Sequence, residues 1–201
     1  LDGRIAFKNV SFQYDDEETP ALENISFELS ANGTLAVVGR TGAGKTTLVE
    51  MITRFLDPDS GTVHIDNHDV RTIPLDTLRD HTGYVPQDVF LFSDTVANNI
   101  AFGALDADRE TIKQAAREAD LLENVADFSD GFDTYVGERG ITLSGGQKQR
   151  TSIARALIRD PRILIFDDAL SAVDTRTEQR ILKRLRERKG DQTLVIVTHR
   201  M

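Results

Sequence analysis

The stretch LAVVGRTGAGKTTLVEMI, Leu35–Ile52, joins an apolar run to a glycine-rich segment and then to an amphipathic pattern. Leu35–Val38 is short and continuously apolar, as expected of a buried parallel strand. From Thr46 onward, apolar residues recur at the spacing of a helix, which we expect to end within Leu56–Gly61, where proline and glycine occur. The stretch therefore predicts a strand, a tight loop and a helix in succession.

The loop, GRTGAGKT at Gly39–Thr46, fits the pattern G-x-x-x-x-G-K-[ST] throughout. Its glycines allow consecutive backbone N–H groups to surround phosphate oxygens, and the following helix adds its positive N-terminal end. Lys45 would supply a mobile positive charge to the β- and γ-phosphates, and the Thr46 hydroxyl is placed to ligate Mg²⁺. A glycine-rich turn without a ligand is the alternative, which the strand–loop–helix context disfavours. The expected nucleotide-binding residues here are Gly39, Arg40, Thr41, Gly42, Ala43, Gly44, Lys45, Thr46 and Thr47.

Two adjacent carboxylates, Asp167 and Asp168, follow the apolar run Ile163–Phe166. Ligands of parallel sheets bind at the carboxyl ends of the strands, so Asp167 is expected to hold Mg²⁺ opposite Thr46, directly or through water. Asp168 emerges on the other side of the extended chain, where it could face an attacking water. The alternative is a strand exit whose aspartate caps the next helix, and this alternative is stronger for Asp168 than for Asp167.

A second glycine-rich segment, LSGGQ at Leu143–Gln147, precedes another amphipathic pattern. Ser144 and Gln147 have the spacing of a capping box, so a well-capped helix is one interpretation. The other is an anion site at a helix N-terminus, where Gly145 and Gly146 permit close approach. Because the first loop already holds one end of a nucleotide, this interpretation predicts a nucleotide sandwiched between two copies or two related chains.

The remaining pattern indicates an α/β core with a helical insertion. Alternating residues in Ile5–Tyr14 and Ile25–Leu29, continued by Val63 and Ile65, predict a small antiparallel sheet. Two further apolar runs, Arg162–Phe166 and Thr193–Val197, predict parallel strands. Helices are expected at Asp108–Ala119, Gly145–Arg159 and Glu178–Arg188, and they dominate from about residue 93 to 159.

The composition limits the possible functions of this 201-residue chain. It contains no cysteine, which excludes disulfides and a cysteine nucleophile. The net charge of −9, without a basic tract, disfavours a nucleic-acid partner. Three histidines, His64, His68 and His81, lie in polar stretches and are expected to be solvated. The basic run Arg180–Lys189 is expected to form the solvated face of a helix.

In this order the motifs resemble those of the nucleotide-binding domain of an ABC transporter, and the resemblance covers essentially the whole chain. Gly39–Thr46 resembles the Walker A motif, Leu143–Gln147 the signature and Ile163–Asp167 the Walker B motif. Ser171–Asp174 is similar to the D-loop, so the resemblance implies that Asp174 lies near nucleotide.

Three further residues match family positions. Gln87 matches the Q-loop glutamine, which the resemblance implies is a sensor of Mg²⁺ and water near the transmembrane contact. His199 matches the switch histidine that contacts the γ-phosphate, and Tyr14 lies where the A-loop aromatic stacks on adenine. The implied catalytic residues are thus Lys45, Gln87, Asp168 and His199, and the implied metal-binding residues are Thr46, Gln87 and Asp167.

The resemblance implies a P-loop NTPase core, RecA-like, with a parallel sheet, an N-terminal antiparallel β subdomain and an inserted helical subdomain. Residues 1–201 would form one nucleotide-binding domain, truncated at its C-terminus, with the helical subdomain at about residues 93–160. The implied ligands are ATP and Mg²⁺, and the implied partners are a second nucleotide-binding domain and a transmembrane domain. Such a domain works at the cytoplasmic face of the cell membrane. The segment Val136–Gly140 looks like a loop of exporter-type domains, although an incidental surface loop is the alternative.

The chain departs from the family pattern at one position. Most active members place glutamate after the Walker B aspartate, and this chain has Asp168. The shorter side chain falls short by about 1–1.5 Å, and misplacement of ~1 Å can reduce positioned catalysis about 10²-fold. We therefore expect ATP binding with slow hydrolysis at this site. The intact Ser144, Gly146 and Gln147 would complete an active site whose glutamate comes from a partner, which predicts a heterodimer; the intact His199 argues mildly against it.

Three alternatives remain open from the sequence. The chain could be an ATP-gated dimerisation module with negligible hydrolysis of its own. It could be a stand-alone ATPase subunit of an importer. A soluble ATPase of DNA repair or translation is disfavoured by the acidic balance and by the lack of a long coiled-coil insertion between the two glycine-rich motifs.

Overall fold

A computed structural model describes residues 1–187 and 192–199, apart from the side chain of Arg139. The chain divides into two compact units. Unit 1 contains residues 1–84, 161–168 and 192–199, and unit 2 contains residues 85–160 and 169–187. The predicted helix end at Arg188 and the basic residue Lys189 lie outside the described residues. A separate helical subdomain at residues 93–160 stays a prediction.

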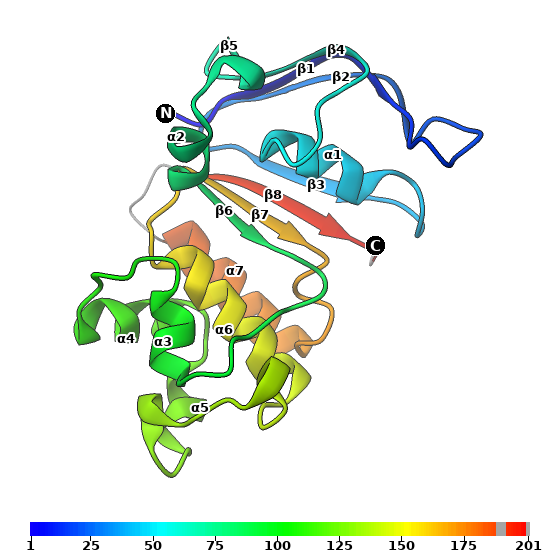
Figure 1. The fold of residues 1–201 in the computed structure, drawn as a ribbon. Helices are drawn as coiled ribbons and strands as arrows, with labels where there is room; N and C mark the ends of the chain where they lie inside the picture. Colours follow the sequence, from blue (N-terminus) through cyan, green and yellow to red (C-terminus); the bar gives the residue numbers. More distant parts are fainter. Residues whose placement is uncertain (188–191, 200–201) are drawn as a thin grey trace. The chain divides into compact units, whose positions relative to one another are not determined.

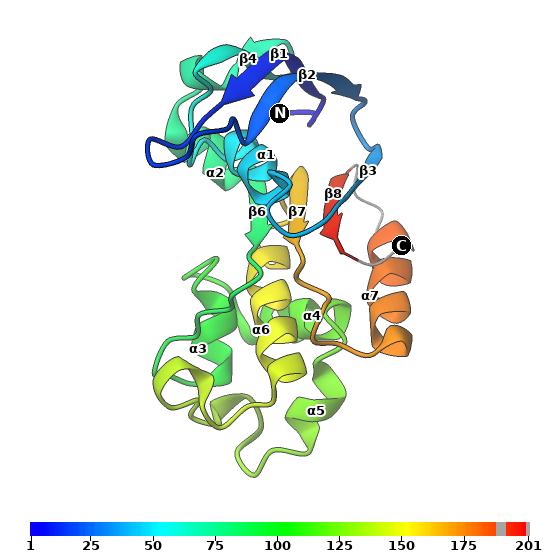
Figure 2. The same ribbon diagram turned by 90° about the vertical axis from the view of Figure 1, so that its right-hand side faces the viewer.

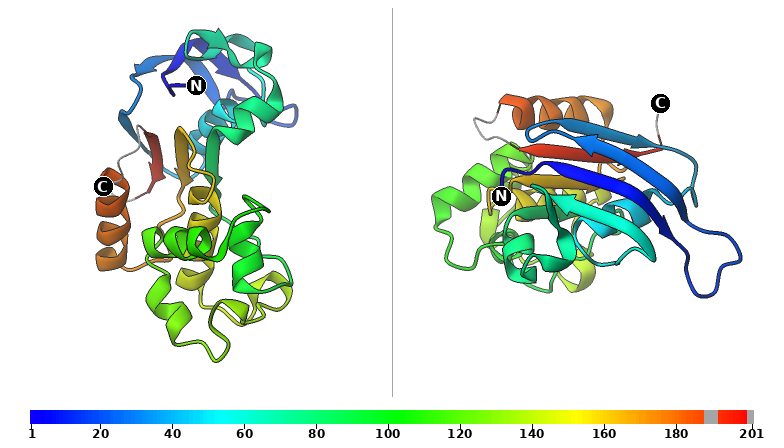
Figure 3. Two further views of the ribbon diagram at one scale, coloured as in Figure 1. Left: turned by 90° about the vertical axis from the view of Figure 1, so that its left-hand side faces the viewer. Right: turned by 90° about the horizontal axis from the view of Figure 1, so that it is seen from above.

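Unit 1 contains an antiparallel sheet with the strand order β2-β1-β4-β5. Its strands are β1 Ile5–Phe12, β2 Leu22–Leu29, β4 Ser60–Ile65 and β5 His68–Asp69. The right-hand view of Figure 3 looks down on this sheet and shows β1 between β2 and β4, with which it pairs. The predicted antiparallel sheet is therefore confirmed. Strand β2 begins at Leu22, earlier than the predicted Ile25. The sequence pattern missed its first residues because Asn24 takes a left-handed φ of 50° and the register shifts beside it, which breaks the alternation of apolar and polar residues.

The second sheet has the strand order β3-β8-β7-β6. Its strands are β3 Thr34–Val38, β6 Thr82–Val85, β7 Ile163–Asp167 and β8 Thr193–Thr198. Strands β3 and β7 both pair in parallel with β8, as predicted, and every residue of β7 is buried.

The burial predicted for Leu35–Val38 is wrong. Within the described part of the sheet β3 has only β8 as a neighbour, and its residues alternate between half-buried and exposed. Val38 is 47% exposed. A continuous apolar run thus identified the strand and its parallel pairing but not its place at an edge.

Helix α1, Lys45–Ile52, lies between the two sheets of unit 1 (Figures 1 and 2). Its Val49 and Met51 are fully buried and share one apolar core with β1 residues such as Ile5 and with β7. The helix ends earlier than predicted, because Arg54 adopts a left-handed φ of 55°. Two short elements that the sequence did not indicate, η1 Val70–Thr72 and α2 Leu75–Asp80, complete unit 1.

Unit 2 is helical. Its elements are α3 Val96–Ala101, α4 Arg109–Glu118, α5 Leu122–Ala126, α6 Gly145–Leu157 and α7 Thr175–Glu187, with the 3₁₀ turns η2 Gly131–Asp133 and η3 Glu138–Gly140. Helix α6 contacts α3 and α4, and α4 contacts α7 (Figure 2). The nearly buried Asp120 carboxylate accepts hydrogen bonds from Arg180 and Arg184 of α7, each at 2.6 Å. None of the described helices is long and apolar enough to cross a membrane.

The burial of β7 leads to a stability prediction. Ile165 is 0% exposed, whereas Ile141 is 78% exposed, so the same truncation can be compared in both environments. We expect Ile165→Ala to lower the free energy of unfolding by about 2–5 kcal/mol, because it leaves a cavity. Ile141→Ala should change it by less than about 0.5 kcal/mol. Urea unfolding followed by circular dichroism measures both, and equal effects would contradict the assigned core.

Candidate functional site

The loop between β3 and α1 is shaped by two glycines in the left-handed region. Gly42 has a φ of 79° and Gly44 a φ of 77°. A Cβ atom at Gly44 would lie 2.2 Å from the carbonyl oxygen of Ala21, so no other residue fits there. A Cβ atom at Gly42 would meet nothing within 4 Å, so the loop is open at that point. The loop thus has the conformation and the open side that a bound anion requires.

Lys45, the first residue of α1, directs its ammonium group into this loop. Its side chain is nearly buried, and Nζ donates to the carbonyl oxygens of Gly39 at 2.9 Å and Arg40 at 2.8 Å. His199, just after β8, lies beside it, with Nδ1 at 3.3 Å from Nζ and at 3.2 Å from the Gly39 carbonyl. Two residues that are 154 positions apart in the sequence therefore meet at the loop.

Asp167, the last residue of β7, faces the start of α1. The Thr46 hydroxyl donates to its Oδ1 at 3.2 Å, and the Tyr84 hydroxyl donates to its Oδ2 at 3.0 Å. Asp167 is only 2% exposed, so these donors replace water around the charge. A hydroxyl and a carboxylate are the hard oxygen donors that Mg²⁺ prefers, and the pair fits this ion.

Asp168 turns away from its neighbour. Its φ is 50°, and its backbone N–H donates to the carbonyl oxygen of Val197 at 3.1 Å. One carboxylate oxygen, Oδ2, lies 3.8 Å from Nε2 of His199. The two aspartates therefore separate, with Asp167 directed at Thr46 and Asp168 directed at His199. This arrangement differs from a helix cap, because α7 begins several residues later with its own capping residue, Asp174.

Tyr14 follows β1 and contacts Thr47, the third residue of α1. Its hydroxyl lies 3.0 Å from Oγ1 of the buried Thr47, and its ring packs edge-on against Phe12 at 4.9 Å. The ring is 39% exposed. An exposed aromatic face near the loop suits base stacking, which stays a prediction.

Sequence reasoning missed two residues of this site, Tyr84 and Glu50. Burial and then the charge of Asp167 raise the pKa of the Tyr84 hydroxyl, so it stays a hydrogen-bond donor. Burial and then the same charge raise the pKa of Glu50, which is half-buried. The spacing could have identified Glu50, because it lies four positions after Thr46 and thus on the same helix face. No sequence signal marked Tyr84.

The other predicted residues belong to unit 2. The capping box is present: Ser144 Oγ accepts from the Gln147 N–H at 3.2 Å, and Gln147 Oε1 accepts from the Ser144 N–H at 2.9 Å. Both Gly145 and Gly146 lie in the first turn of α6. Asp174 accepts from the N–H groups of Arg176 and Thr177 at 3.1 Å each.

The surroundings of Asp174 and Gln87 complete the description of the predicted residues in unit 2. Hydrogen bonds from Thr177 lower the pKa of Asp174. The segment before α7 is tied to α6, because Gln149 Oε1 accepts from the Ala172 N–H at 3.1 Å. Gln87 is exposed. The structure thus brings together Tyr14, the loop, Asp167, Asp168 and His199 in unit 1, and it brings together the segments of Ser144 and Asp174 in unit 2.

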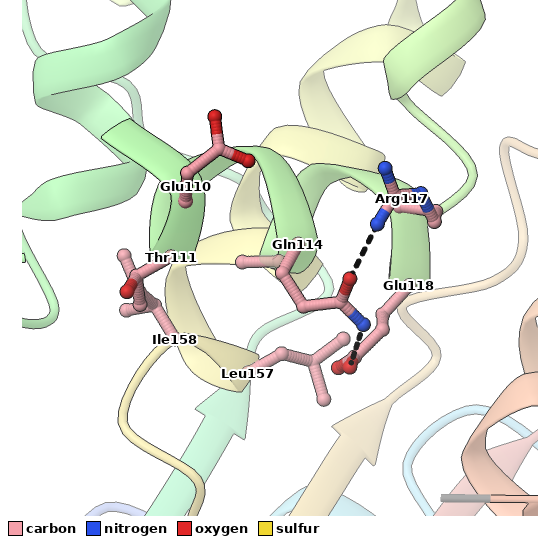
Figure 4. Close-up of a pocket in the computed structure, with 8 residues that line it drawn as sticks. Glu110, Thr111, Gln114, Arg117, Glu118, Leu157 and Ile158 are labelled. Carbon is pink, nitrogen blue, oxygen red and sulfur yellow. Dashed lines mark hydrogen bonds between the residues drawn. The ribbon is translucent and has the colours of Figure 1, made fainter. Parts of the chain in front are cut away.

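A cavity of about 380 Å³ lies elsewhere, on α4 (Figure 4). Gln114 crosses it, accepting from Arg117 at 2.5 Å and donating to Glu118 at 2.8 Å, above Leu157 and Ile158 of the α6 end. No predicted site residue lines it. Among the histidines, His68 is exposed, whereas His64 and His81 are half-buried.

Comparisons with known proteins agree with this geometry. Residues 22–171 match the family described as ABC transporter. The ATP-dependent lipid A-core flippase of Vibrio cholerae is 46% identical over 202 residues, covering 100% of this chain and 35% of the flippase. The uncharacterized ABC transporter ATP-binding protein YfiB of Bacillus subtilis is 49% identical over 183 residues, covering 91% of this chain and 32% of YfiB.

A solved structure of an ABC exporter is also similar to this chain. A bacterial Atm1-family ABC exporter with ATP bound matches with a TM-score of 0.94 and 43% identity, covering 98% of this chain and 34% of the exporter chain. The chain thus spans about a third of the length of the relatives that it matches.

The glycine loop, its lysine and threonine, and the carboxylate opposite define a P-loop nucleotide-binding domain. This chain belongs to the ABC transporter family. The predicted fold class, an α/β P-loop core with an antiparallel sheet and a helical part, is confirmed.

The capping box at Ser144 leads to a prediction. Ser144→Ala removes the side-chain acceptor at the α6 N-terminus and should lower the free energy of unfolding by about 1 kcal/mol. Ser129→Ala is the matched control, because the Ser129 hydroxyl makes only an exposed hydrogen bond to the adjacent Asp130. Urea unfolding without nucleotide measures both variants. If they have equal effects, the cap does not stabilise α6.

Proposed function

We propose that this chain is the ATP-hydrolysing motor domain of a membrane exporter, and that its own nucleotide site turns over slowly. One observation carries the proposal: Lys45, Thr46, Asp167 and His199 converge on an open glycine loop, from segments far apart in the sequence. The family relationship and the exporters among the relatives support it.

Each residue of the site has a role in this proposal. The backbone N–H groups of the loop and the Lys45 ammonium hold the phosphates of ATP, and the Tyr14 ring stacks on the base. Thr46 and Asp167, with Gln87, would hold Mg²⁺. When bound, the ion neutralises charge on the phosphates. Asp168 orients and deprotonates the attacking water, and His199 donates to the γ-phosphate.

The signature segment acts on a second nucleotide site. In the proposed head-to-tail dimer, Ser144, Gly146 and Gln147 bind the ATP held by a partner nucleotide-binding domain, with Asp174 near the same site. The partner contributes its own signature to the site of this chain. Because Asp168 replaces the expected glutamate, we propose that the partner is a different chain with a glutamate at this position.

Attached transmembrane helices would select and move the substrate, and the domain would lie at the cytoplasmic face of the membrane. The loop at Val136–Gly140 fits the exporter assignment. One observation favours a second candidate, an ATP-gated dimerisation module with negligible hydrolysis. The Asp168 carboxylate lies 3.8 Å from His199 Nε2, and a carboxylate held there is drawn away from an attacking water.

The phosphate role of Lys45 can be tested by nucleotide binding. Lys45→Ala should weaken ATP binding about 10- to 100-fold, since hydrogen bonds to charged groups contribute ~1.5–3 kcal/mol. Lys8→Ala removes an exposed lysine of β1 and should leave the affinity unchanged. Titration with a fluorescent ATP analogue measures both. Unchanged affinity of Lys45→Ala would refute nucleotide binding at this loop.

The slow-turnover proposal can be tested by lengthening one side chain. Asp168→Glu should raise ATP turnover in the assembled dimer at least several-fold, because it moves the carboxylate about 1–1.5 Å further out. Asp127→Glu, at an exposed position of unit 2, is the control and should have no effect. Phosphate release measures turnover. No increase in the first variant would contradict the role given to Asp168, and brisk turnover by the unaltered chain alone would contradict the asymmetric dimer.

A further inference from the structure

The Asp167 carboxylate is held from both sides. Thr46 of α1 donates to Oδ1 at 3.2 Å, and Tyr84 of β6 donates to Oδ2 at 3.0 Å. Both carboxylate oxygens are therefore occupied by hydroxyl donors that come from different elements. A carboxylate with one donor can still rotate about its terminal torsion, whereas a carboxylate with a donor on each oxygen has a fixed plane.

A second carboxylate, that of Glu50, interacts electrostatically with Asp167. Glu50 lies one turn after Thr46 on α1, and burial, followed by the charge of Asp167, raises the pKa of this half-buried carboxyl. Like charges in a poorly solvated site repel, and the repulsion would turn Asp167 away from Glu50. Water cannot screen the repulsion well, because Asp167 is only 2% exposed. The half-buried Tyr84 hydroxyl is the donor that offsets it on the Oδ2 side.

We propose that Tyr84 is a positioning residue, which holds the Asp167 carboxylate in the orientation that binds Mg²⁺ and so sets the Mg²⁺ affinity of the nucleotide site. This inference rests on the ATP-binding function proposed above. In this proposal Tyr84 acts through Asp167, to which its hydroxyl donates, and is not itself a ligand of the ion. Residues that orient a metal-binding side chain change metal affinity about 10- to 100-fold when they are replaced.

Tyr84→Phe tests the inference, because it removes one hydroxyl and keeps the ring. Binding of a fluorescent ATP analogue is measured in EDTA and then across a Mg²⁺ titration. We expect the half-saturating Mg²⁺ concentration to rise about 10-fold, while the affinity in EDTA stays unchanged. Tyr135→Phe is the matched control, because it also removes a hydrogen-bonded tyrosine hydroxyl, one that donates to the backbone carbonyl oxygen of Ser93 in unit 2 and not to a carboxylate. It should leave both values unchanged.

A double-mutant cycle separates positioning from a general structural effect. In an Asp167→Asn background, Tyr84→Phe should not change the Mg²⁺ titration further, because its target has lost its charge. Additive effects of the two substitutions would overturn the proposal. An unchanged Mg²⁺ titration of Tyr84→Phe would overturn it too, as would a loss of affinity that is equal with and without Mg²⁺. Thermal unfolding of each variant identifies a general loss of structure, which would also count against a positioning role.

The two proposals fail in different ways. If the unaltered chain does not bind the ATP analogue even at saturating Mg²⁺, then nucleotide binding itself is wrong. If the unaltered chain binds with a clear Mg²⁺ dependence and Tyr84→Phe shares that dependence, then only the role of Tyr84 is wrong.

Discussion

Unit 1 is organised around the buried negative charge of Asp167. The carboxylate ends the fully buried strand β7, where an ionised group is unfavourable unless donors or cations compensate it. The compensation comes from α1 through Thr46 and from β6 through Tyr84. The start of α1 is in turn fixed by the glycine loop and by Lys45. The position of the loop, the first turn of α1 and the ends of two strands are thus linked through one side chain.

Much of this arrangement could be predicted from the sequence, because its strongest signals are local. The glycine spacing required a strand before it and a helix after it, and β3 and α1 have this order. The capping box at Ser144 could also be predicted, because its two residues, Ser144 and Gln147, lie within one helical turn of each other. The apolar run Ile163–Phe166 correctly indicated a buried strand, because β7 has neighbours on both sides.

Other features could not be predicted, because they depend on contacts between distant residues or on left-handed backbone. The burial of β3 depends on the number of neighbouring strands, which its apolar run cannot report. The early end of α1 follows from Arg54, a residue type with no preference for positive φ. Tyr84 donates to Asp167 from a position 83 residues earlier in the sequence. A pattern of hydrophobicity does not predict the partner of a tyrosine hydroxyl.

The backbone at position 168 has a consequence for the choice of residue there. A φ of 50° is uncommon outside glycine, and asparagine and aspartate tolerate it best, because their short polar side chains can bond locally. A longer acidic side chain would reach further toward water but gains less from this conformation. Conformational preference favours aspartate at this position, and catalytic reach favours glutamate. Under the function proposed above, the same position faces opposing demands from backbone conformation and from turnover, and the aspartate of this chain satisfies the conformational demand.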